Sequence, residues 1–178
     1  SVFTLYRSNL SISDSDLVDG SAFHHGGFIY AFGQSSAFIQ NVSMSNGVAE
    51  VGRGGGIVLE YSSLQASHLK MTNCRSLFSH GGAVYMTGNS SLICADCVFK
   101  NNSARMQGRG GAISFASEEM RPDAIQPFNC IFQNNSANYG GEQISLFASN
   151  TVSLLCRCIA RCESTVCSEL YGAIKVQI

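Results

Sequence analysis

The sequence predicts an all-β protein, a right-handed parallel β-helix of about six coils with roughly 29 residues each. Three observations predict this fold. A Gly-Gly-aliphatic motif recurs from end to end, a second motif recurs in step with it, and the stretches between them alternate apolar and polar residues. Self-similarity at a fixed period is typical of a solenoid, whose repeats stack to bury a shared core. We therefore expect residues 1–178 to form a single β-helix segment, and that segment to be part of a longer solenoid.

The glycine motif occurs in five copies and a degenerate sixth. The pairs begin at Gly26, Gly55, Gly81, Gly110 and Gly140, and the sixth copy is Tyr171-Gly172. Three residues after each first position we expect an inward aliphatic side chain, found as Ile29, Val58, Val84, Ile113 and Ile174. The fifth copy has Gln143 at this place and Ile144 after it, which predicts a slip of one residue.

The second motif is a large apolar residue, any residue, and then Asn. Its apolar members are Met44, Met71, Phe99 and Phe132, and its Asn members are Asn46, Asn73, Asn101 and Asn134. Serine pairs at Ser35-Ser36, Ser62-Ser63 and Ser90-Ser91 precede the first three copies. Stacked coils place equivalent positions about 4.8 Å apart. The apolar members should then form an inward ladder, and the Asn members a hydrogen-bonded ladder at a turn.

The segments between the landmarks read as short strands. Gly81–Met86 and Cys97–Lys100 alternate in polarity and contain β-branched or aromatic residues, whereas no stretch sustains a helical period. The recurrent glycines would break the paired helices of an α-solenoid, and a propeller blade needs a longer repeat. The glycines themselves are expected at corners, where the backbone adopts a positive φ or neighbouring coils approach closely.

These motifs resemble the repeats of chlamydial polymorphic membrane proteins. Gly81-Gly82-Ala83-Val84 and Gly110-Gly111-Ala112-Ile113 match the GGA[ILV] motif of that family, and Phe99–Asn102 and Phe132–Asn135 match its FxxN motif. Similar repeats occur in other surface β-helix proteins. The resemblance implies a right-handed parallel β-helix in an extracellular or cell-surface, adhesin-like protein. The cysteine-rich last unit and the Met-x-Asn copies depart from the bacterial pattern.

Composition limits the partners. The chain is 45% hydrophobic and 13% charged, with a net charge of −1, which argues against binding to nucleic acid. No run approaches the roughly 18 apolar residues of a membrane-spanning helix. The partners expected are a protein, a glycan or further copies of the chain.

Catalytic and metal-binding candidates are few. Asp14, Asp16 and Asp19 lie close together, and Ile12-Ser13-Asp14 aligns with the apolar-x-Asn motif, so we interpret Asp14 as a turn residue within a lengthened polar turn, Asp14–His25. A Ca²⁺ site is the alternative interpretation of this aspartate cluster.

His25 and His80 precede glycine pairs two coils apart and are interpreted as surface histidines without an aligned carboxylate. The Gly-Arg-Gly-Gly segments at Arg53 and Arg109 open no predicted helix, so we interpret them as repeat corners and not phosphate loops. We expect no catalytic residue, no metal and no cofactor.

The cysteines and the sequons favour an extracellular or cell-surface location. The disulfide candidates are Cys74, Cys94, Cys97, Cys130, Cys156, Cys158, Cys162 and Cys167, and the glycosylation candidates are Asn9, Asn41, Asn89, Asn101 and Asn134. Cys97, Cys130 and Cys158 each lie two residues before the apolar position of their unit, which places them in one inward column where neighbours come within disulfide range. Buried free thiols and, less favoured, a metal site are the alternatives.

An insertion interrupts the fourth interval, between Ala116 and Asp123. Insertions in solenoids form loops on one face, often the binding face, so its charged residues are partner-loop candidates: Glu118, Glu119, Arg121 and Asp123. The sequence thus predicts a non-catalytic structural or adhesive module that presents a rigid surface to protein or glycan partners or builds a filament. The alternative is a segment of a carbohydrate-active β-helix enzyme whose catalytic coils lie outside this chain.

Overall fold

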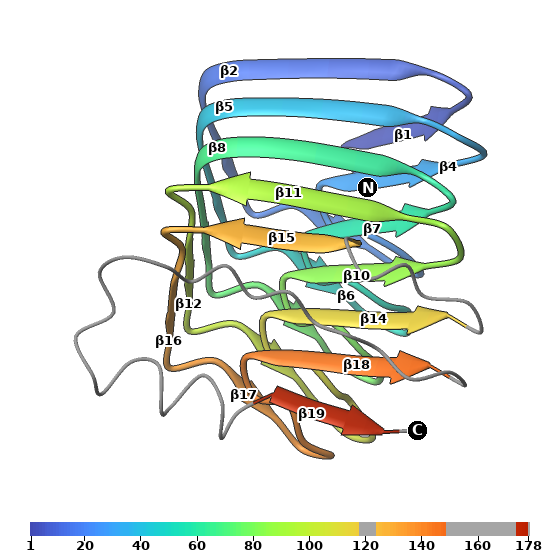
Figure 1. Ribbon diagram of the computed structural model, residues 1–178, viewed down its shortest axis with the longest axis vertical. Helices are drawn as coiled ribbons and strands as arrows, with labels where there is room; N and C mark the ends of the chain where they lie inside the picture. Colours follow the sequence, from blue (N-terminus) through green and yellow to red (C-terminus); the bar gives the residue numbers. More distant parts are fainter. Residues whose placement is uncertain (118–123, 149–173, 178) are drawn as a thin grey trace.

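The computed structural model describes residues 1–117, 124–148 and 174–177. The chain winds through three sheets, A, B and C, whose strands pair in parallel with the equivalent strands of the neighbouring coils (Figure 1). None of the described residues lies in a helix. The predicted all-β parallel solenoid is therefore confirmed. Among the described residues sheet C has 5 strands, so five coils contribute to all three sheets there, where about six coils were predicted.

Each sheet collects one side of the coils. Sheet A contains β1 (Phe3–Tyr6), β4 (Ile29–Phe32), β7 (Ile57–Glu60), β10 (Val84–Thr87), β14 (Ile113–Ser117), β18 (Ile144–Ala148) and β19 (Ile174–Gln177). Sheet B contains β2 (Asn9–Val18), β5 (Ser36–Ser45), β8 (Ser63–Thr72), β11 (Ser91–Ala95), β12 (Val98–Lys100), β15 (Ile125–Phe128) and β16 (Ile131–Gln133). Sheet C contains β3 (Ser21–Ala22), β6 (Val48–Ala49), β9 (Arg75–Ser76), β13 (Ser103–Ala104) and β17 (Ser136–Ala137).

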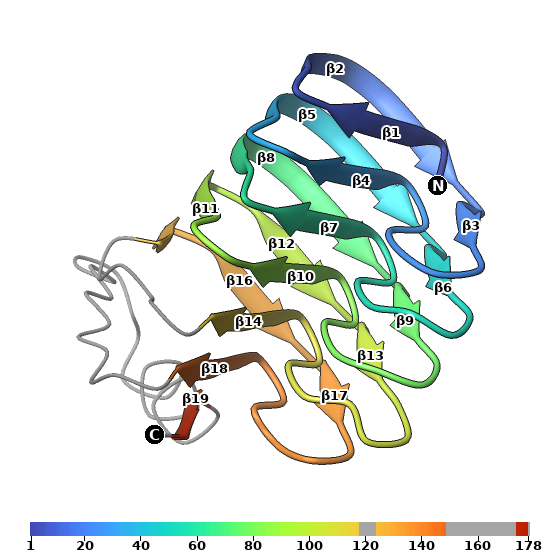
Figure 2. The ribbon, with the colours of Figure 1, turned by 90° about the vertical axis from the view of Figure 1, so that its right-hand side faces the viewer.

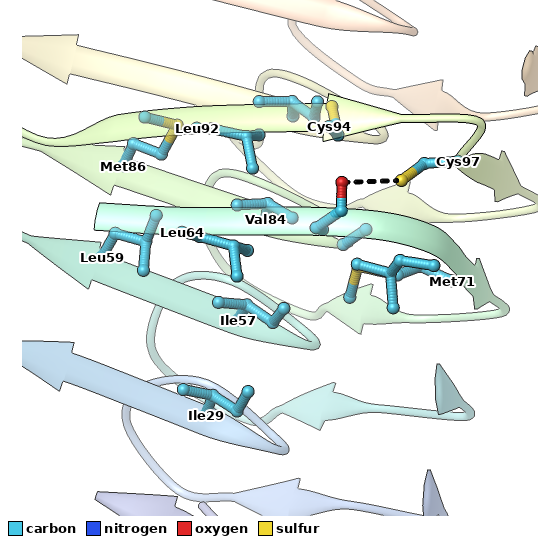
Figure 3. Close-up of a cluster of buried hydrophobic side chains, with 14 of the residues drawn as sticks. Ile29, Ile57, Leu59, Leu64, Met71, Val84, Met86, Leu92, Cys94 and Cys97 are labelled. Carbon is cyan, nitrogen blue, oxygen red and sulfur yellow. Dashed lines mark hydrogen bonds between the residues drawn. The ribbon is translucent and has the colours of Figure 1, made fainter. Parts of the chain in front are cut away.

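The core lies between the inner faces of the sheets, where like positions stack from coil to coil. Sheet B carries the predicted apolar ladder, in which Met44 pairs with Met71, Met71 with Phe99, and Phe99 with Phe132. The Phe99 and Phe132 rings are stacked with their centroids 5.0 Å apart. Opposite them, sheet A contributes Ile29, Ile57 and Val84, all with no exposed surface (Figure 3). Each coil therefore covers the apolar face of the next.

The corner glycine of the third coil is not the one that the sequence predicted. Ile57, and not Val58, pairs with Ile29 and Val84. The glycine equivalent to Gly26 and Gly81 is accordingly Gly54, which has a φ of 63°. A Cβ on Gly54 would lie 2.4 Å from the carbonyl oxygen of Ile57, so this corner accepts only glycine. Three consecutive glycines, 54–56, concealed the correct frame in the sequence.

The predicted slip in the fifth copy is confirmed. Ile144 pairs with Ile113, and Ile174 pairs in turn with Ile144. Gly141 has a φ of 66° and so stands where Gly110 stands one coil earlier. The corner glycine of this coil is therefore Gly141 and not Gly140, and the inward aliphatic residue follows it three positions later, as in the other coils.

The aspartates near the N-terminus occupy two corners that were predicted as one lengthened turn. Leu17, and not Ile12, pairs with Met44, so the apolar-x-Asn position of the first coil is Leu17-Val18-Asp19. Asp19 accepts a hydrogen bond from Asn46 Nδ2 at 2.9 Å, within the predicted Asn ladder. Asp14 is a turn residue, with a φ of 49°, but at a different corner that bends β2 in its middle. The Asp14–His25 segment has ordinary repeat length, because Asp16 lies in strand β2 and Asp19 falls at the regular Asn corner.

Serine hydroxyls form the second polar ladder. The backbone N–H of Ser8 donates to Ser35 Oγ at 3.2 Å, that of Ser35 to Ser62 Oγ at 3.1 Å, and that of Ser62 to Ser90 Oγ at 3.2 Å. The first serine of each predicted pair is thus the buried one. Each hydroxyl satisfies a donor of the preceding coil at a place where no strand ladder continues.

The insertion falls between strands β14 and β15. Ala116 pairs with Thr87, and Ile125 pairs with Leu92. Ile125 follows Ala116 by nine positions, whereas Leu92 follows Thr87 by five, so the insertion adds four residues. The partner-loop candidates Glu118, Glu119, Arg121 and Asp123 lie outside the described residues. The regular strands on both sides show that the stack accommodates the insertion without a change of register.

Candidate binding face

One edge of the solenoid carries a basic side chain at each of the first four glycine corners. His25, Arg53, His80 and Arg109 each stand directly before a glycine of positive φ, and we call them the cationic column. Backbone hydrogen bonds fix their alignment. Gly26 N donates to Arg53 O at 3.2 Å, Gly54 N to His80 O at 3.0 Å, and Gly81 N to Arg109 O at 2.9 Å. Neighbouring members are therefore spaced by about 4.8 Å, the distance between paired strands.

Arg53 and Tyr85 form the centre of this corner. The Arg53 guanidinium lies 4.8 Å from the centroid of the Tyr85 ring, and its Nη1 donates a hydrogen bond to the Tyr85 hydroxyl at 2.9 Å. The His80 ring is stacked against the same tyrosine, with centroids 6.4 Å apart and an angle of 21° between the planes. Strand β10 positions Tyr85, and the adjoining corners position the two basic groups. The arrangement holds a guanidinium in a fixed orientation at the surface.

The histidines of the column are held by backbone donors. Arg109 N donates to His80 Nδ1 at 3.1 Å, and Arg53 N donates to His25 Nδ1 at 3.5 Å. Because Nδ1 accepts in each case, the neutral imidazole carries its proton on Nε2. His25 and His80 are therefore not simply surface histidines, as the sequence suggested, but half-buried groups built into the corner.

Burial and the neighbouring arginines set the protonation of the column. Burial lowers the pKa of His80, and the charges of Arg53 and Arg109 lower it further. Burial also lowers the pKa of His25, against an opposing effect of the Glu60 carboxylate. Glu60 in turn accepts a hydrogen bond from the Tyr30 hydroxyl at 2.8 Å. The Arg53–Arg109 part of the column is thus a site of two permanent charges with a neutral donor between them.

A hollow lies beside the cationic column, over the outer surface of sheet A. This cavity of about 530 Å³ is lined by the side chains of Arg53, His80, Tyr85 and Arg109, together with Ser114 and Tyr139. Its volume is in the range of small-ligand sites. The loops that join sheet C to sheet A form its outer wall, and they project together along one side of the solenoid (Figure 2).

The same loops carry a row of exposed large apolar side chains. Val51, Phe78, Met106 and Tyr139 each lie two residues beyond the last residue of their sheet C strand, and we call them the apolar row. Their exposed fractions are 48%, 55%, 57% and 58%. Phe78 and Tyr139 also line the cavity. Large apolar groups that recur on the exposed loops of successive coils are typical of an interaction surface.

Most of this face could not be recognised from the predicted alignment of the glycines. Aligning Gly55 with Gly26 placed Gly54 in the column and removed Arg53 from it, and Arg109 was interpreted only as part of a repeat corner. Gly54 is the glycine with the positive φ, and the inward Ile57 follows it three residues later. An alignment on Gly54 would therefore have been the correct one. The basic column could have been found from that frame.

The described cysteines form one cluster and one separate site. Cys97 and Cys130 are adjacent in one column, since Ile131 N donates to Cys97 O at 2.8 Å, and Cys94 lies beside them. The Cys130 thiol also donates to Cys94 O at 3.4 Å. Cys97 donates to Ala66 O at 3.9 Å, which points it into the core (Figure 3). Cys74 is buried in another column, between Gly47 and Asn102. All four are thiols in this structure, and Cys156, Cys158, Cys162 and Cys167 lie outside the described residues.

The three thiols of the cluster differ in pKa. Hydrogen bonds from Cys130 and Cys94 lower the pKa of Cys97, because they stabilise its thiolate. The hydrogen bonds to Cys130 and Cys97 raise the pKa of Cys94. Burial raises the pKa of the separate Cys74 to about 12. Cys97 therefore loses its proton most readily, but it has no exposed surface, whereas Cys130 is partly exposed.

The remaining candidates are distributed over the surface. The sequon residues Asn9, Asn41, Asn89, Asn101 and Asn134 are all exposed. Asp14 accepts a hydrogen bond from Asn41 Nδ2 at 2.8 Å. Across residues 1–117, 124–148 and 174–177, no three His, Cys, Asp or Glu side chains are grouped so that they could hold a metal ion. The same residues include no helix that is long and apolar enough to cross a membrane.

Comparison with known proteins identifies one repeat. No curated protein matches the chain, and no solved structure matches it. Residues 96–116 match the Chlamydia polymorphic membrane protein repeat. The matched stretch contains the Phe99–Asn102 and Gly110–Ile113 motifs, which form strand β12 and lead into β14. The resemblance predicted from these motifs is confirmed, and the solenoid contains a coil similar to the repeat of the Chlamydia polymorphic membrane proteins.

Proposed function

We propose that this chain is a non-catalytic adhesive module of an extracellular or cell-surface protein. The apolar row carries this proposal, because four coils in succession present a large apolar side chain at the same exposed position. A soluble protein has no reason within its own fold to repeat such exposure, whereas a binding surface requires it. The coil that resembles a repeat of membrane proteins supports a location at the cell surface.

The regular stack supports the same role. Inward positions are filled by apolar ladders, and the buried side-chain polar atoms of the described residues all have hydrogen-bond partners. Such a stack is stiff, so it can present a surface without losing conformational entropy on binding. A protein, a glycan and further copies of the chain are the partners that such a surface suits.

An adhesion assay tests the proposal. Beads coated with the chain would be applied to printed glycans, to extracellular-matrix proteins and to surfaces coated with the chain itself. The test variant replaces the apolar row by serine, as V51S/F78S/M106S/Y139S. The control variant, F38S/I93S, replaces exposed apolar residues of β5 and β11 on sheet B.

We expect the parent beads to adhere to at least one surface, the row variant to lose at least tenfold of that adhesion, and the control to retain it. Absence of adhesion to every surface, or equal adhesion of the row variant, would overturn the proposal. Release of sugar fragments from a polysaccharide panel would instead establish the alternative, a segment of a carbohydrate-active enzyme. Circular dichroism of each variant would verify that the solenoid is folded.

A further inference from the structure

We propose that the loops between sheets C and A bind a second copy of the chain, which lies antiparallel to the first across a two-fold axis. This inference rests on the adhesive function proposed above and names the partner of the apolar row. Two exposed charges beside the row select both the partner and its orientation: Glu50 in the loop after β6, and Arg105 in the loop after β13 (Figure 2).

Glu50 and Arg105 lie at equivalent positions on either side of Leu77. The backbone N–H of each of these residues donates to the carbonyl oxygen of the last sheet C residue in the preceding coil, at 2.9 Å for Glu50 and Arg105 and 3.0 Å for Leu77. Glu50 and Arg105 are exposed, and neither forms an ion pair within the part of the chain that the structure describes. A partner of uniform charge, such as an acidic polysaccharide or an anionic membrane, would meet one attractive and one repulsive group here. A partner with the same two charges in reverse order would meet two attractive ones.

A second copy presents that reversed order when it lies antiparallel to the first. A two-fold axis along the loop after β9 turns the second copy so that its loop after β13 faces the loop after β6 of the first. Glu50 of each copy then faces Arg105 of the other, and Leu77 and Phe78 face their own counterparts at the axis. Contacts between identical patches across a two-fold axis are the commonest form of homo-oligomer interface.

The apolar row complements itself in the same arrangement. Val51 directly follows Glu50, and Met106 directly follows Arg105, so these two apolar side chains face each other across the interface. Met106 stands on a turn closed by a hydrogen bond from Gly108 N to Arg105 O at 2.8 Å, and its long side chain meets the smallest member of the row. The exposed apolar groups supply the area that drives association, whereas exposed ion pairs contribute little affinity and fix the orientation.

The charges disfavour the other ways of pairing the two rows. In a parallel dimer, Glu50 faces Glu50 and Arg105 faces Arg105. An antiparallel dimer with its axis along the loop after β6 or the loop after β13 repeats one of these contacts. An axis midway between neighbouring loops places Leu77 against Glu50 or against Arg105. Like-charge contacts and unpaired charges cost affinity, so the axis along the loop after β9 is favoured over these alternatives.

Sedimentation equilibrium of the intact chain tests this inference by measuring the dissociation constant of the dimer. The test variants are Glu50→Arg and Arg105→Glu, together with the double variant E50R/R105E, which exchanges the two charges. Arg75→Glu serves as the matched control, because it reverses an exposed charge of β9 that faces only its own counterpart across the axis. Circular dichroism verifies the fold of each variant, and Glu50→Gln and Arg105→Gln are milder replacements for a variant that does not fold.

We expect the parent chain to form a reversible dimer below millimolar concentration. Each single variant places like charges at both ion pairs and should weaken the dimer at least tenfold, whereas the double variant should return to within threefold of the parent. A mixture of the two single variants should form a heterodimer at least tenfold tighter than either variant alone, because one copy then carries two positive groups and the other two negative groups. Arg75→Glu should change the dissociation constant by less than twofold.

A chain that stays monomeric up to millimolar concentration would overturn the inference. A dimer that the single variants leave unchanged, or that neither the double variant nor the mixture restores, would overturn it as well. The adhesive function is tested separately by the bead assay. Beads that adhere to a glycan or a matrix protein, while the chain is monomeric in solution, would leave the adhesive module standing and reject the second copy as its partner. Dimerisation in solution without adhesion of the beads to any surface would reject the adhesive module alone.

Discussion

Asn102 and Asn135 stack in neighbouring coils, and Asn102 Nδ2 donates a hydrogen bond to Asn135 Oδ1 at 2.9 Å in the interior of the solenoid. Asn102 Oδ1 also accepts from Cys74 N at 2.9 Å, and its Nδ2 donates to Met71 O at 3.1 Å. Asn135 repeats the pattern by donating to Phe99 O at 3.0 Å. These side chains bind backbone groups of two coils at the corner between sheets B and C.

Replacing Asn102 by alanine should destabilise the chain more than replacing its neighbour Asn101. Asn102→Ala leaves the buried N–H of Cys74 without the Asn102 acceptor and removes the hydrogen bonds to Met71 O and Asn135 Oδ1, so it should lower the free energy of unfolding by about 2–4 kcal/mol. Asn101 is exposed with a φ of 56°, so Asn101→Ala should cost only about 1 kcal/mol. Urea unfolding of both variants checks the order, and a larger loss for Asn101→Ala would contradict the assignment.

The contrast between these two residues explains how far the sequence could predict the fold. Period, strand content and the ladder through Met71 and Phe99 follow from spacing alone, because stacking makes equivalent positions adjacent. The sequence could not tell which of two adjacent asparagines is buried. That choice depends on the side to which the corner turns each side chain, and Asn101 with its positive φ turns outward.

The candidate face was less predictable for a related reason. Its components come from four different coils, and they meet only when the register is correct to one residue. An error of one residue at Gly54 removed Arg53 from the column, although His25 and His80 were aligned correctly. In a run of identical residues such as Gly54–Gly56, the sequence does not show which glycine stands at the corner. Backbone conformation and the close approach of neighbouring coils decide it.

The cysteine cluster predicts one disulfide. We expect oxidised glutathione to link Cys97 to Cys130. The partly exposed Cys130, once deprotonated, displaces one glutathione thiolate to form a mixed disulfide, and the Cys97 thiolate then attacks the Cys130 sulfur and releases the second glutathione. The bond would close a loop across adjacent coils and should stabilise the chain by about 3–4 kcal/mol.

Peptide mapping by mass spectrometry under non-reducing conditions checks this pairing. Cys74, with its pKa raised by burial, should remain a thiol under the same treatment. A Cys97→Ser variant should lose the cross-link and the accompanying rise in Tm. A bond between Cys94 and Cys97, or reaction at Cys74 first, would contradict the proposed order of reactivity.

His80 predicts a loss of stability in mild acid. Burial, Arg53 and Arg109 lower its pKa in the folded chain, so the unfolded chain binds the proton more readily. This contribution is fully present above the unfolded pKa of about 6.5 and is lost as the pH falls toward the lower folded pKa. The groups facing His80 are Arg53, Arg109 and Tyr85, and none of them supplies a compensating negative charge.

His80→Asn tests this dependence, because the asparagine Oδ1 can replace Nδ1 as acceptor for the Arg109 N–H without titrating. The free energy of unfolding, measured between pH 7.5 and pH 5, should fall less in this variant than in the parent chain. His68→Asn, at an exposed corner of β8 with a φ of 53°, controls for the loss of an imidazole. Parallel pH profiles for the parent and His80→Asn would refute the assignment.

We expect the insertion to affect binding without affecting the stability of the solenoid. Replacing residues 117–124 by the shorter segment 88–91 restores the spacing found between Thr87 and Leu92, so the unfolding free energy should change by less than about 1 kcal/mol. The replaced segment contains Glu118, Glu119, Arg121 and Asp123, a net negative charge that begins directly after Ser117, and Ala116 lines the cavity. Insertions in solenoids often form part of the binding face, so we expect the graft to lower adhesion of the coated beads at least twofold. A graft that retains the same number of acidic residues separates charge from loop length. Unchanged adhesion in both grafts would remove the insertion from the binding face, whereas a loss of adhesion in both would make it a direct contact for the partner.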